Sequence, residues 1–201
     1  MAGKSLICLA VIAASLVAVQ GMSKPSFCKN YDCPPFDTQK VNGIERRTYG
    51  ETKWVGTSKV ASSSDSASNG MFMKLFKYIQ GENSAGKKIK MTVPVATKVQ
   101  SLGGGQYRYT MMFYIPEANP PTPNDDQLDI ITLPARDVYV RTFHKWFFMA
   151  TNSEYVDNAD ELRTSLDSNS ATYDMGSYYQ VGYTSPMWPL RKHHEVWLDS
   201  A

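Results

Sequence analysis

The proline-rich segment 117–126, EANPPTPNDD, constrains the fold of this chain more than any other feature of its sequence. Proline has no N–H to donate to a sheet ladder, so a segment with three prolines between positions 120 and 123 cannot continue a strand. We interpret it as a rigid, extended connector. On each side of it the hydrophobic pattern has the same order of strand, strand, helix, strand and strand. The connector therefore predicts a chain built from two similar halves.

The first half contains four runs whose composition and alternation are typical of strands. The third run, KIKMTVPVATK, has a basic entry and a proline in its middle, which places it at an edge, a bulge or a bend of the sheet. The fourth run alternates, with Tyr107, Tyr109, Met111, Phe113 and Ile115 on one face. The expected strands are Val41–Tyr49, Glu51–Val60, Lys88–Val99 and Gln106–Ile115, and a turn at Gly103–Gly105 joins the last two into a hairpin.

A helix is expected between the second and third of these strands. Asp65 is a suitable N-cap, helical periodicity follows it, and Gly81 ends the helix. One face is apolar and carries Met71, Phe72, Leu75, Phe76 and Ile79, with Lys74 and Lys77 at its margin. Such a face usually fills a core, but methionine and aromatic side chains also suit an adaptable pocket for a flat apolar ligand. The residues alone leave both interpretations open.

The second half repeats this order. Its helix, Thr151–Asp167, begins with Thr151 and Glu154 at the spacing of a capping box. The apolar stripe of that helix consists of Tyr155, Ala159, Leu162 and Leu166. The expected strands are Gln127–Leu133, Asp137–Phe148, Ser177–Tyr183 and His194–Leu198. The two patterns together predict an α+β fold, a distorted antiparallel β-barrel of two pseudo-repeated halves, each with one flanking helix.

The first 21 residues have the pattern of a secretory signal peptide. Lys4 precedes an uncharged apolar run, Leu6–Val19, and small residues lead to a cleavage point after Gly21. The alternative, a membrane anchor, needs roughly 20 apolar residues, which is longer than this run. We expect cleavage of residues 1–21 and a secreted protein whose residues 22–37 form an extended lead-in.

The lead-in carries the two cysteines that remain after cleavage, Cys28 and Cys33. In an oxidising compartment two thiols five positions apart most simply form a local disulfide. We expect it to staple the N-terminus rather than the core. The competing interpretation, a thiolate ligand for a metal or haem at Cys33-Pro34, rests on a dipeptide alone.

Composition excludes some function classes. The 21 Lys and Arg residues nearly balance the 19 Asp and Glu residues, so we expect no nucleic-acid partner. Only three histidines are present, and His193 and His194 adjoin Glu195 in a predicted strand. Neighbouring residues of a strand point to opposite faces, so at most one of these histidines can share a face with Glu195. We therefore expect no metal site and no enzymatic activity.

Three segments carry a resemblance to a known family. KMTVPVATKV (90–99), MMFYIPEANPPTPND (111–125) and VGYTSPMWPLRKHHEVWL (181–198), in this order and spacing, resemble the SOUL family of haem-binding proteins. The resemblance extends from about Phe36 to Leu198 and implies a family domain at residues 38–201. It also implies a barrel of two related halves and a hydrophobic groove that takes haem or another tetrapyrrole.

The resemblance places the groove along the first helix, the MTVP segment and the C-terminal loop. In relatives a basic residue of the first helix is linked to the porphyrin propionates; Asn69 stands at that position here, and Lys74 and Lys77 could replace it as a basic rim. No histidine precedes His144, so we expect no histidine ligand to the iron, and contact without coordination rather than weak ligation by Met71 or Met73. The expected ligand-binding residues are Asn69, Met71, Phe72, Met73, Lys74, Leu75, Phe76, Lys77, Met91, Val93, Pro186, Met187 and Trp188.

The sequence thus predicts a secreted, monomeric, non-enzymatic binding protein for haem or a related tetrapyrrole. Three alternatives remain open: a broad-specificity binder of amphipathic small molecules, a protein-interaction module that docks a partner on the apolar helix, and an enzyme acting on such a ligand. The candidate groups for the last are Glu195, Tyr109 and Tyr114.

Overall fold

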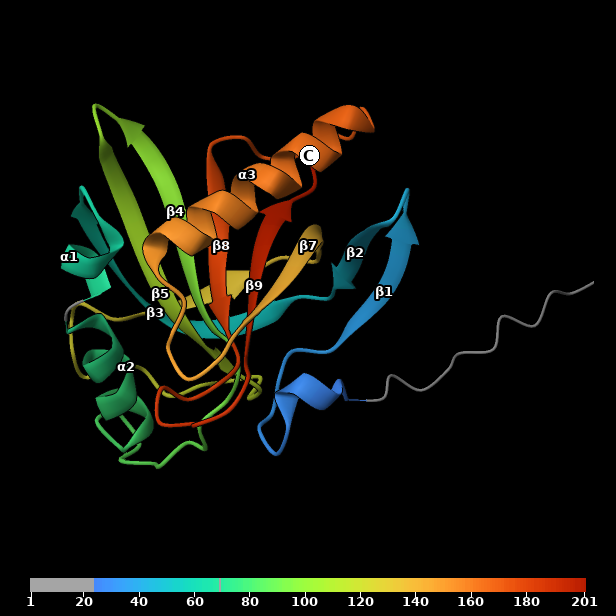
Figure 1. The fold of residues 1–201 in the computed structure, drawn as a ribbon. Helices are drawn as coiled ribbons and strands as arrows, with labels where there is room; N and C mark the ends of the chain where they lie inside the picture. Colours follow the sequence, from blue (N-terminus) through green and yellow to red (C-terminus); the bar gives the residue numbers. More distant parts are fainter. Residues whose placement is uncertain (1–23, 69) are drawn as a thin grey trace, which may run out of the picture.

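A computed structural model of the chain describes residues 24–68 and 70–201. The predicted signal peptide and Asn69 lie outside the described residues. Nine strands of the described part form a single curled antiparallel sheet (Figure 1). The strands are β1 (Phe36–Val41), β2 (Ile44–Tyr49), β3 (Thr52–Ala61), β4 (Val95–Gly103), β5 (Gln106–Ile115), β6 (Asp129–Leu133), β7 (Arg136–Lys145), β8 (Ser177–Gly182) and β9 (Lys192–Asp199). The helices are α1 (Ser64–Ser68), α2 (Met71–Ile79) and α3 (Asn152–Ser168), and a short 3-10 turn, η1 (Ser26–Cys28), precedes β1.

The strand order shows how the two halves are related. It runs β1-β2-β7-β9-β8-β4-β5-β3-β6, and β8 and β4 pair in the middle, from Val95 with Gly182 to Gln100 with Ser177. Outward from that pair, β8-β9-β7-β2 on one side corresponds to β4-β5-β3-β6 on the other. Each half therefore gives one strand to the other half: β2 pairs with β7, and β6 pairs with β3. β1 extends the sheet beyond β2. The predicted α+β fold, a distorted barrel of two pseudo-repeated halves, is confirmed.

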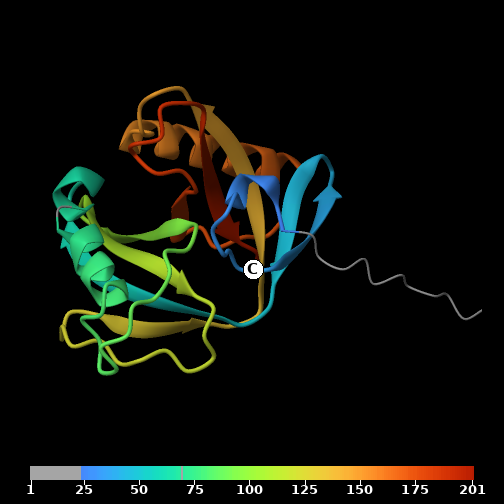
Figure 2. The ribbon, with the colours of Figure 1, turned by 90° about the horizontal axis from the view of Figure 1, so that it is seen from below.

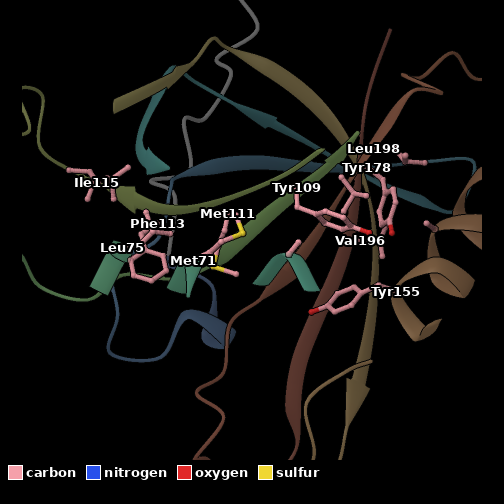
Figure 3. Close-up of a cluster of buried hydrophobic side chains, with 14 of the residues drawn as sticks. Met71, Leu75, Tyr109, Met111, Phe113, Ile115, Tyr155, Tyr178, Val196 and Leu198 are labelled. Atoms are coloured by element: carbon pink, nitrogen blue, oxygen red, sulfur yellow. The ribbon is translucent and has the colours of Figure 1, made fainter. Parts of the chain in front are cut away.

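The helices follow the same relation. α1 and α2 pack on β3 and β5, whereas α3 packs on β7 and β9, the equivalent strands of the second half. Figure 2 shows α1 and α2 beside the first half and α3 beside the second. The sheet is apolar on both faces because β5 alternates between two clusters: Tyr109, Met111, Phe113 and Ile115 face the helices, and Met112 faces the opposite side. Figure 3 shows the cluster on the helical side, which extends from α2 and β5 to α3, β8 and β9.

The first helical segment differs from the prediction of one continuous helix. Gly70 adopts a left-handed conformation, with φ of 82°, and separates α1 from α2. Glycine is the residue that reaches this conformation without steric cost, so it allows the chain to change direction here. α2 then buries Met71, Leu75, Tyr78 and Ile79, and Gly81, with φ of 117°, follows its end as predicted.

Two predicted strands also differ. Val41–Tyr49 is not one strand but the turn and second arm of a hairpin, because Asn42 and Gly43 both have positive φ, 51° and 83°. An Asn-Gly pair is the strongest local signal for such a hairpin, and the sequence interpretation missed it. Lys88–Val99 is not a strand before Val95: Pro94 has no N–H for the ladder and follows a cis peptide bond, and Val93 N–H donates instead to the Asp32 carbonyl at 2.9 Å.

The second half agrees with the sequence except that β7 ends at Lys145, three residues before the predicted end at Phe148. α3 begins at a capping box in which the Thr151 hydroxyl accepts from the Glu154 N–H and the Glu154 carboxylate accepts from the Thr151 N–H. Its buried residues are the four predicted ones, Tyr155, Ala159, Leu162 and Leu166. The stripe repeats every three or four residues and therefore stays on one side of the helix.

The predicted disulfide between Cys28 and Cys33 closes a loop within the lead-in. In contrast to the prediction, the disulfide is part of the core, since Cys28 is fully buried in the second apolar cluster. Phe27, beside it, stacks on His193 with ring centroids 4.4 Å apart. The lead-in thus covers one face of β9.

Beneath the lead-in lies a buried ionic network. The Arg47 guanidinium of β2 donates two hydrogen bonds of 2.8 Å to the Glu195 carboxylate of β9, and both side chains are almost inaccessible to solvent. His193 Nε2 lies 2.6 Å from the same carboxylate, and Trp197 Nε1 donates to it at 2.7 Å. Burial alone raises the pKa of Glu195, but the hydrogen bond from His193 and the charge of Arg47 outweigh burial, so this pKa lies well below its ordinary value.

Candidate functional site

The described residues enclose an apolar pocket of about 650 Å³ between the two halves. Its walls come from the lead-in, both first-half helices, the segment before β4, strands β4, β5 and β8, the start of α3 and the loop after β8. The lining consists of Tyr31, Ser64, Ala67, Ser68, Met71, Phe72, Phe76, Met91, Val93, Val95, Thr97, Tyr109, Met111, Met149, Ala150, Asn152, Tyr155, Gln180, Gly182, Tyr183, Thr184, Ser185, Pro186 and Met187. The volume lies within the roughly 300–1,000 Å³ of typical ligand pockets.

The lining carries no charged side chain among the described residues, and no histidine. Its polar groups are hydroxyls and amides. Asn152 and Gln180, for example, form a hydrogen bond of 2.9 Å from Gln180 Nε2 to Asn152 Oδ1. Five methionines and six aromatic side chains supply most of the remainder. Such a surface favours flat or flexible apolar ligands, because thioethers and rings contact them without requiring one fixed geometry.

The break at Gly70 explains how α2 contributes to the pocket. The helix keeps Leu75 and Ile79 against the sheet, whereas Phe72 and Phe76 are one turn apart and reach the pocket. Their rings stack at 6.0 Å, and Phe72 meets Phe113 edge to face at 5.2 Å. The two phenylalanines therefore form a connected aromatic wall whose position is set by contact with β5.

On the α3 side, Tyr155 lines the pocket and is backed by a histidine. Its hydroxyl lies 2.8 Å from His194 Nδ1, and His194 is fully buried outside the lining. Burial, then the charges of His193 and Lys192, lower the pKa of His194 to about 4, which keeps this imidazole neutral at neutral pH. Burial also raises the pKa of Tyr155 above its ordinary value. The pair therefore presents a neutral phenol to the pocket.

Gly182 of β8 lines the pocket beside this pair. A Cβ at Gly182 would stand 3.9 Å from both His194 Nδ1 and the Tyr155 hydroxyl, which is an ordinary contact distance, so the pair does not require glycine at this position.

The pocket gathers seven of the predicted ligand-binding residues: Met71, Phe72, Phe76, Met91, Val93, Pro186 and Met187. Five others lie outside the lining. Leu75 is part of the core, Met73 and Trp188 are exposed, and the two lysines have other neighbours. Lys74 donates to the Gln127 side chain, and the Lys77 ammonium lies 4.0 Å from Glu82. The predicted basic rim of Lys74 and Lys77 therefore does not border this pocket.

Sequence reasoning missed the part of the lining that comes from β4, β5, β8 and the start of α3; from the second half it included only Pro186 and Met187. Tyr109 and Met111 could have been included, because both were already assigned to one apolar face of their strand. Met149, Asn152, Tyr155 and Gln180 carried no such signal. They reach the pocket only because β8 pairs with β4, a long-range contact that local periodicity does not report.

The part of the chain that the structure describes offers little else for chemistry. No group of three or more His, Cys, Asp or Glu side chains there could hold a metal ion. His193 and Glu195 are two positions apart in β9 and share a face, in agreement with the prediction that at most one histidine could do so. Their contact is part of the buried ionic network. Within residues 24–68 and 70–201, no helix combines the length and the apolar character of a membrane span.

The fold and the pocket together define an α+β protein of two related halves that enclose an uncharged, apolar binding cavity. Comparison with known proteins gives the family. The sequence model of the SOUL heme-binding protein family matches residues 31–199, and the chain belongs to this family.

Relatives agree over nearly the whole chain. Heme-binding protein 2 of Homo sapiens is 34% identical over 191 residues, covering 92% of this chain and 90% of its own. Heme-binding protein 1 of Mus musculus is 31% identical over 191 residues, covering 90% and 99%. Among solved structures, a hydrolase from Listeria innocua shares the fold, with a TM-score of 0.56 at 11% identity over 79% of this chain and 91% of its own.

Proposed function

We propose that this protein binds haem or a related tetrapyrrole in the pocket between its two halves. The observation that carries the proposal is an uncharged pocket of about 650 Å³, rich in methionine and aromatic residues, in a member of the SOUL heme-binding protein family. Two relatives that match most of the chain are themselves named heme-binding proteins.

The lining suits a porphyrin ring. Phe72, Phe76 and Met111 would cover its apolar faces, and burial of those faces supplies affinity. The propionates would meet only neutral donors of the lining, such as the amides of Asn152 and Gln180. Affinity should therefore depend weakly on ionic strength, since no ion pair within the lining is available for salt to screen.

We further propose that the iron has no histidine ligand. His144, His193 and His194 all lie outside the lining, and His194 is separated from it by Tyr155. A bound haem would supply a strong visible absorption and an iron to which the described lining offers no histidine. Protein contact without coordination predicts that protoporphyrin IX, which lacks the iron, binds about as well as haemin. It also predicts that added imidazole shifts the haemin complex to a low-spin spectrum.

Secretion and a binding role without catalysis are part of the same proposal. The N-terminal signal-peptide pattern and a disulfide in the lead-in support secretion, because disulfides persist in oxidising compartments. The absence of catalysis is proposed on the composition of the lining, which among the described residues has no histidine, cysteine or carboxylate to act as base or nucleophile. The monomeric state stays a prediction from the sequence.

A second candidate function is broad binding of amphipathic small molecules. The five methionines of the lining favour it, because unbranched thioether side chains adapt to ligands of different shape. Competition distinguishes the two functions. A tetrapyrrole-specific pocket releases haemin only to other porphyrins, whereas a broad one also releases it to unrelated planar dyes.

The decisive experiment is a haemin titration followed by the Soret band and by tryptophan quenching. Phe72→Ala combined with Phe76→Ala should weaken binding at least about tenfold, because two rings that would pack on the ligand are removed. Met73→Ala is the matched control: it changes an exposed residue of the same helix outside the lining and should change affinity by less than about twofold. A wild-type protein without saturable binding at micromolar haemin would refute the proposal.

A further inference from the structure

Two loops at one end of the sheet expose an unusual number of large apolar side chains. The loop after β7 presents Trp146, Phe147 and Phe148, which are 59%, 63% and 76% exposed. The loop between β8 and β9 presents Met187, Trp188 and Leu190, which are 91%, 41% and 53% exposed. We refer to these six residues as the tip patch. Apolar patches of this kind on a soluble protein mark interaction sites.

The strand register brings the two loops together at the pocket. Lys145, at the end of β7, pairs with Lys192, at the start of β9, so the two loops leave the sheet at the same point. They lie side by side in both Figure 1 and Figure 2. Met149 of one loop and Met187 of the other line the pocket. The tip patch is therefore continuous with the pocket wall.

The second loop is held in shape by a buried cation. The Lys192 ammonium, which is fully buried, donates to the carbonyl oxygens of Ser185, Pro186 and Trp188 at 3.1, 2.8 and 2.6 Å. These bonds satisfy all three donors of the ammonium group. The backbone of this loop is thus tied to the core while Met187 and Leu190 face solvent, so their exposure is a property of the folded state.

The charged residues within the two segments that carry the tip patch have one sign. Segments 138–153 and 175–194 contain Lys, Arg and His residues but no Asp or Glu. Lys145 is paired with Glu154, but in the described part of the chain neither Lys29 nor Arg191 forms a salt bridge. Lys29 stands 3.6 Å from the centre of the Trp188 ring, and Arg191 lies 2.9 Å from His144 Nδ1. An apolar centre beside two cations that form no salt bridge among the described residues complements a surface that is apolar inside and anionic outside.

We propose that the tip patch inserts into a lipid surface that carries anionic headgroups. Tryptophan and phenylalanine favour the boundary between headgroups and acyl chains, and nearby lysine and arginine residues attract anionic lipid. Side chains as exposed as Phe148 and Met187 have little support from their neighbours, which suits a fluid interface better than a rigid protein surface. Insertion places the mouth of the pocket at the lipid boundary, where an amphipathic ligand can pass between the lipid and the protein.

Vesicle flotation of the purified protein, without haemin, tests this inference separately from haem binding. We expect binding to phosphatidylcholine vesicles that contain phosphatidylserine, and weaker binding to phosphatidylcholine alone or at high salt. Tryptophan emission should shift to the blue on binding. Only Trp146 and Trp188 can cause the shift, because Trp54 and Trp197 are already buried.

Matched variants locate the contact. Phe147→Ser combined with Phe148→Ser should lower the vesicle partition coefficient at least about tenfold, because two inserting rings are lost. Met175→Ser alters a residue that is 78% exposed at the opposite end of β8, and it should change partitioning by less than about twofold. Lys29→Glu combined with Arg191→Glu should remove the preference for anionic vesicles.

Three results would overturn the proposal: no binding to either vesicle composition, equal binding by the Phe147/Phe148 variant, or self-association through the patch. Self-association would appear in sedimentation as a dimer that the Phe147/Phe148 variant abolishes. In that case the partner of the tip patch would be a second copy of the chain. Haemin titration of the same variant shows whether the pocket is intact, so loss of lipid binding is distinguished from loss of the proposed haem site.

Discussion

Substitution of Glu195 by glutamine should lower the free energy of unfolding by about 3–5 kcal/mol, the range observed when one partner of a buried ion pair is removed. Glutamine keeps the size of the side chain but replaces one carboxylate oxygen by an amide donor. The Glu195 carboxylate accepts from Arg47, His193 and Trp197 within 2.6 to 2.8 Å, so at least one buried donor would lose its acceptor. The Arg47 guanidinium, 1% exposed, would then keep only its 2.6 Å ion pair with the partly exposed Glu45 carboxylate.

Urea denaturation measures the effect. Trp54 and Trp197 are both 1% exposed and report global unfolding by fluorescence. With a slope of about 1–3 kcal/mol per molar urea, the midpoint should fall by at least about 1 M. Glu161→Gln is the control: its ion pair with Arg141 is on the surface, so its loss should cost less than about 1 kcal/mol.

A double variant tests the cause. Arg47→Met combined with Glu195→Leu removes both charges and should be more stable than Glu195→Gln alone, because no uncompensated charge remains buried. If Glu195→Gln costs no more than the surface control, or if the double variant is the less stable of the two, the argument from buried charge is wrong.

Three further predictions concern stability. The pKa of His194 falls from 6.5 in the unfolded chain to about 4 in the folded protein, because the folded protein holds the imidazole neutral. The contribution of His194 to the free energy of unfolding is therefore complete above pH 6.5 and is lost as the pH falls towards 4. The change should be about 3 kcal/mol in denaturant titrations at stepped pH, and His194→Gln should reduce the slope. Cys28→Ser combined with Cys33→Ser opens the disulfide loop and should cost about 2 kcal/mol or more by thermal unfolding; equal stability with and without reductant in the wild type would contradict this. Thr151→Ala removes a capping hydroxyl and should cost about 1 kcal/mol in urea, whereas Thr151→Ser should be nearly neutral.

Features encoded within a few residues could be predicted from the sequence. α3 was predicted with its capping box and its buried stripe because both signals lie inside one helix. The triple-glycine turn between β4 and β5 also follows from local conformational freedom, since Gly103, Gly104 and Gly105 all have positive φ. The Asn42-Gly43 hairpin was equally local, and only its interpretation failed.

The residues that line the pocket could not all be predicted from local sequence patterns. The periodicity of α2 marked Phe72 and Phe76 as apolar but could not separate the pocket wall from the core, which Leu75 occupies. That separation depends on the direction in which Gly70 turns the helix. Likewise, nothing near Lys74 or Lys77 in the sequence shows that their neighbours are Gln127 and Glu82 rather than a ligand.

By itself, then, the sequence determined the two halves, the second helix and the family, because repeat order, capping and motif spacing are read along the chain. Tertiary structure alone decided the exchange of β2 and β6 between the halves and the pairing of β4 with β8. The paired residues are more than 70 positions apart in the sequence, and local periodicity carries no information about such distant contacts. They bring Tyr155 and Gln180 of one half to Phe72 and Met111 of the other, and so create the pocket.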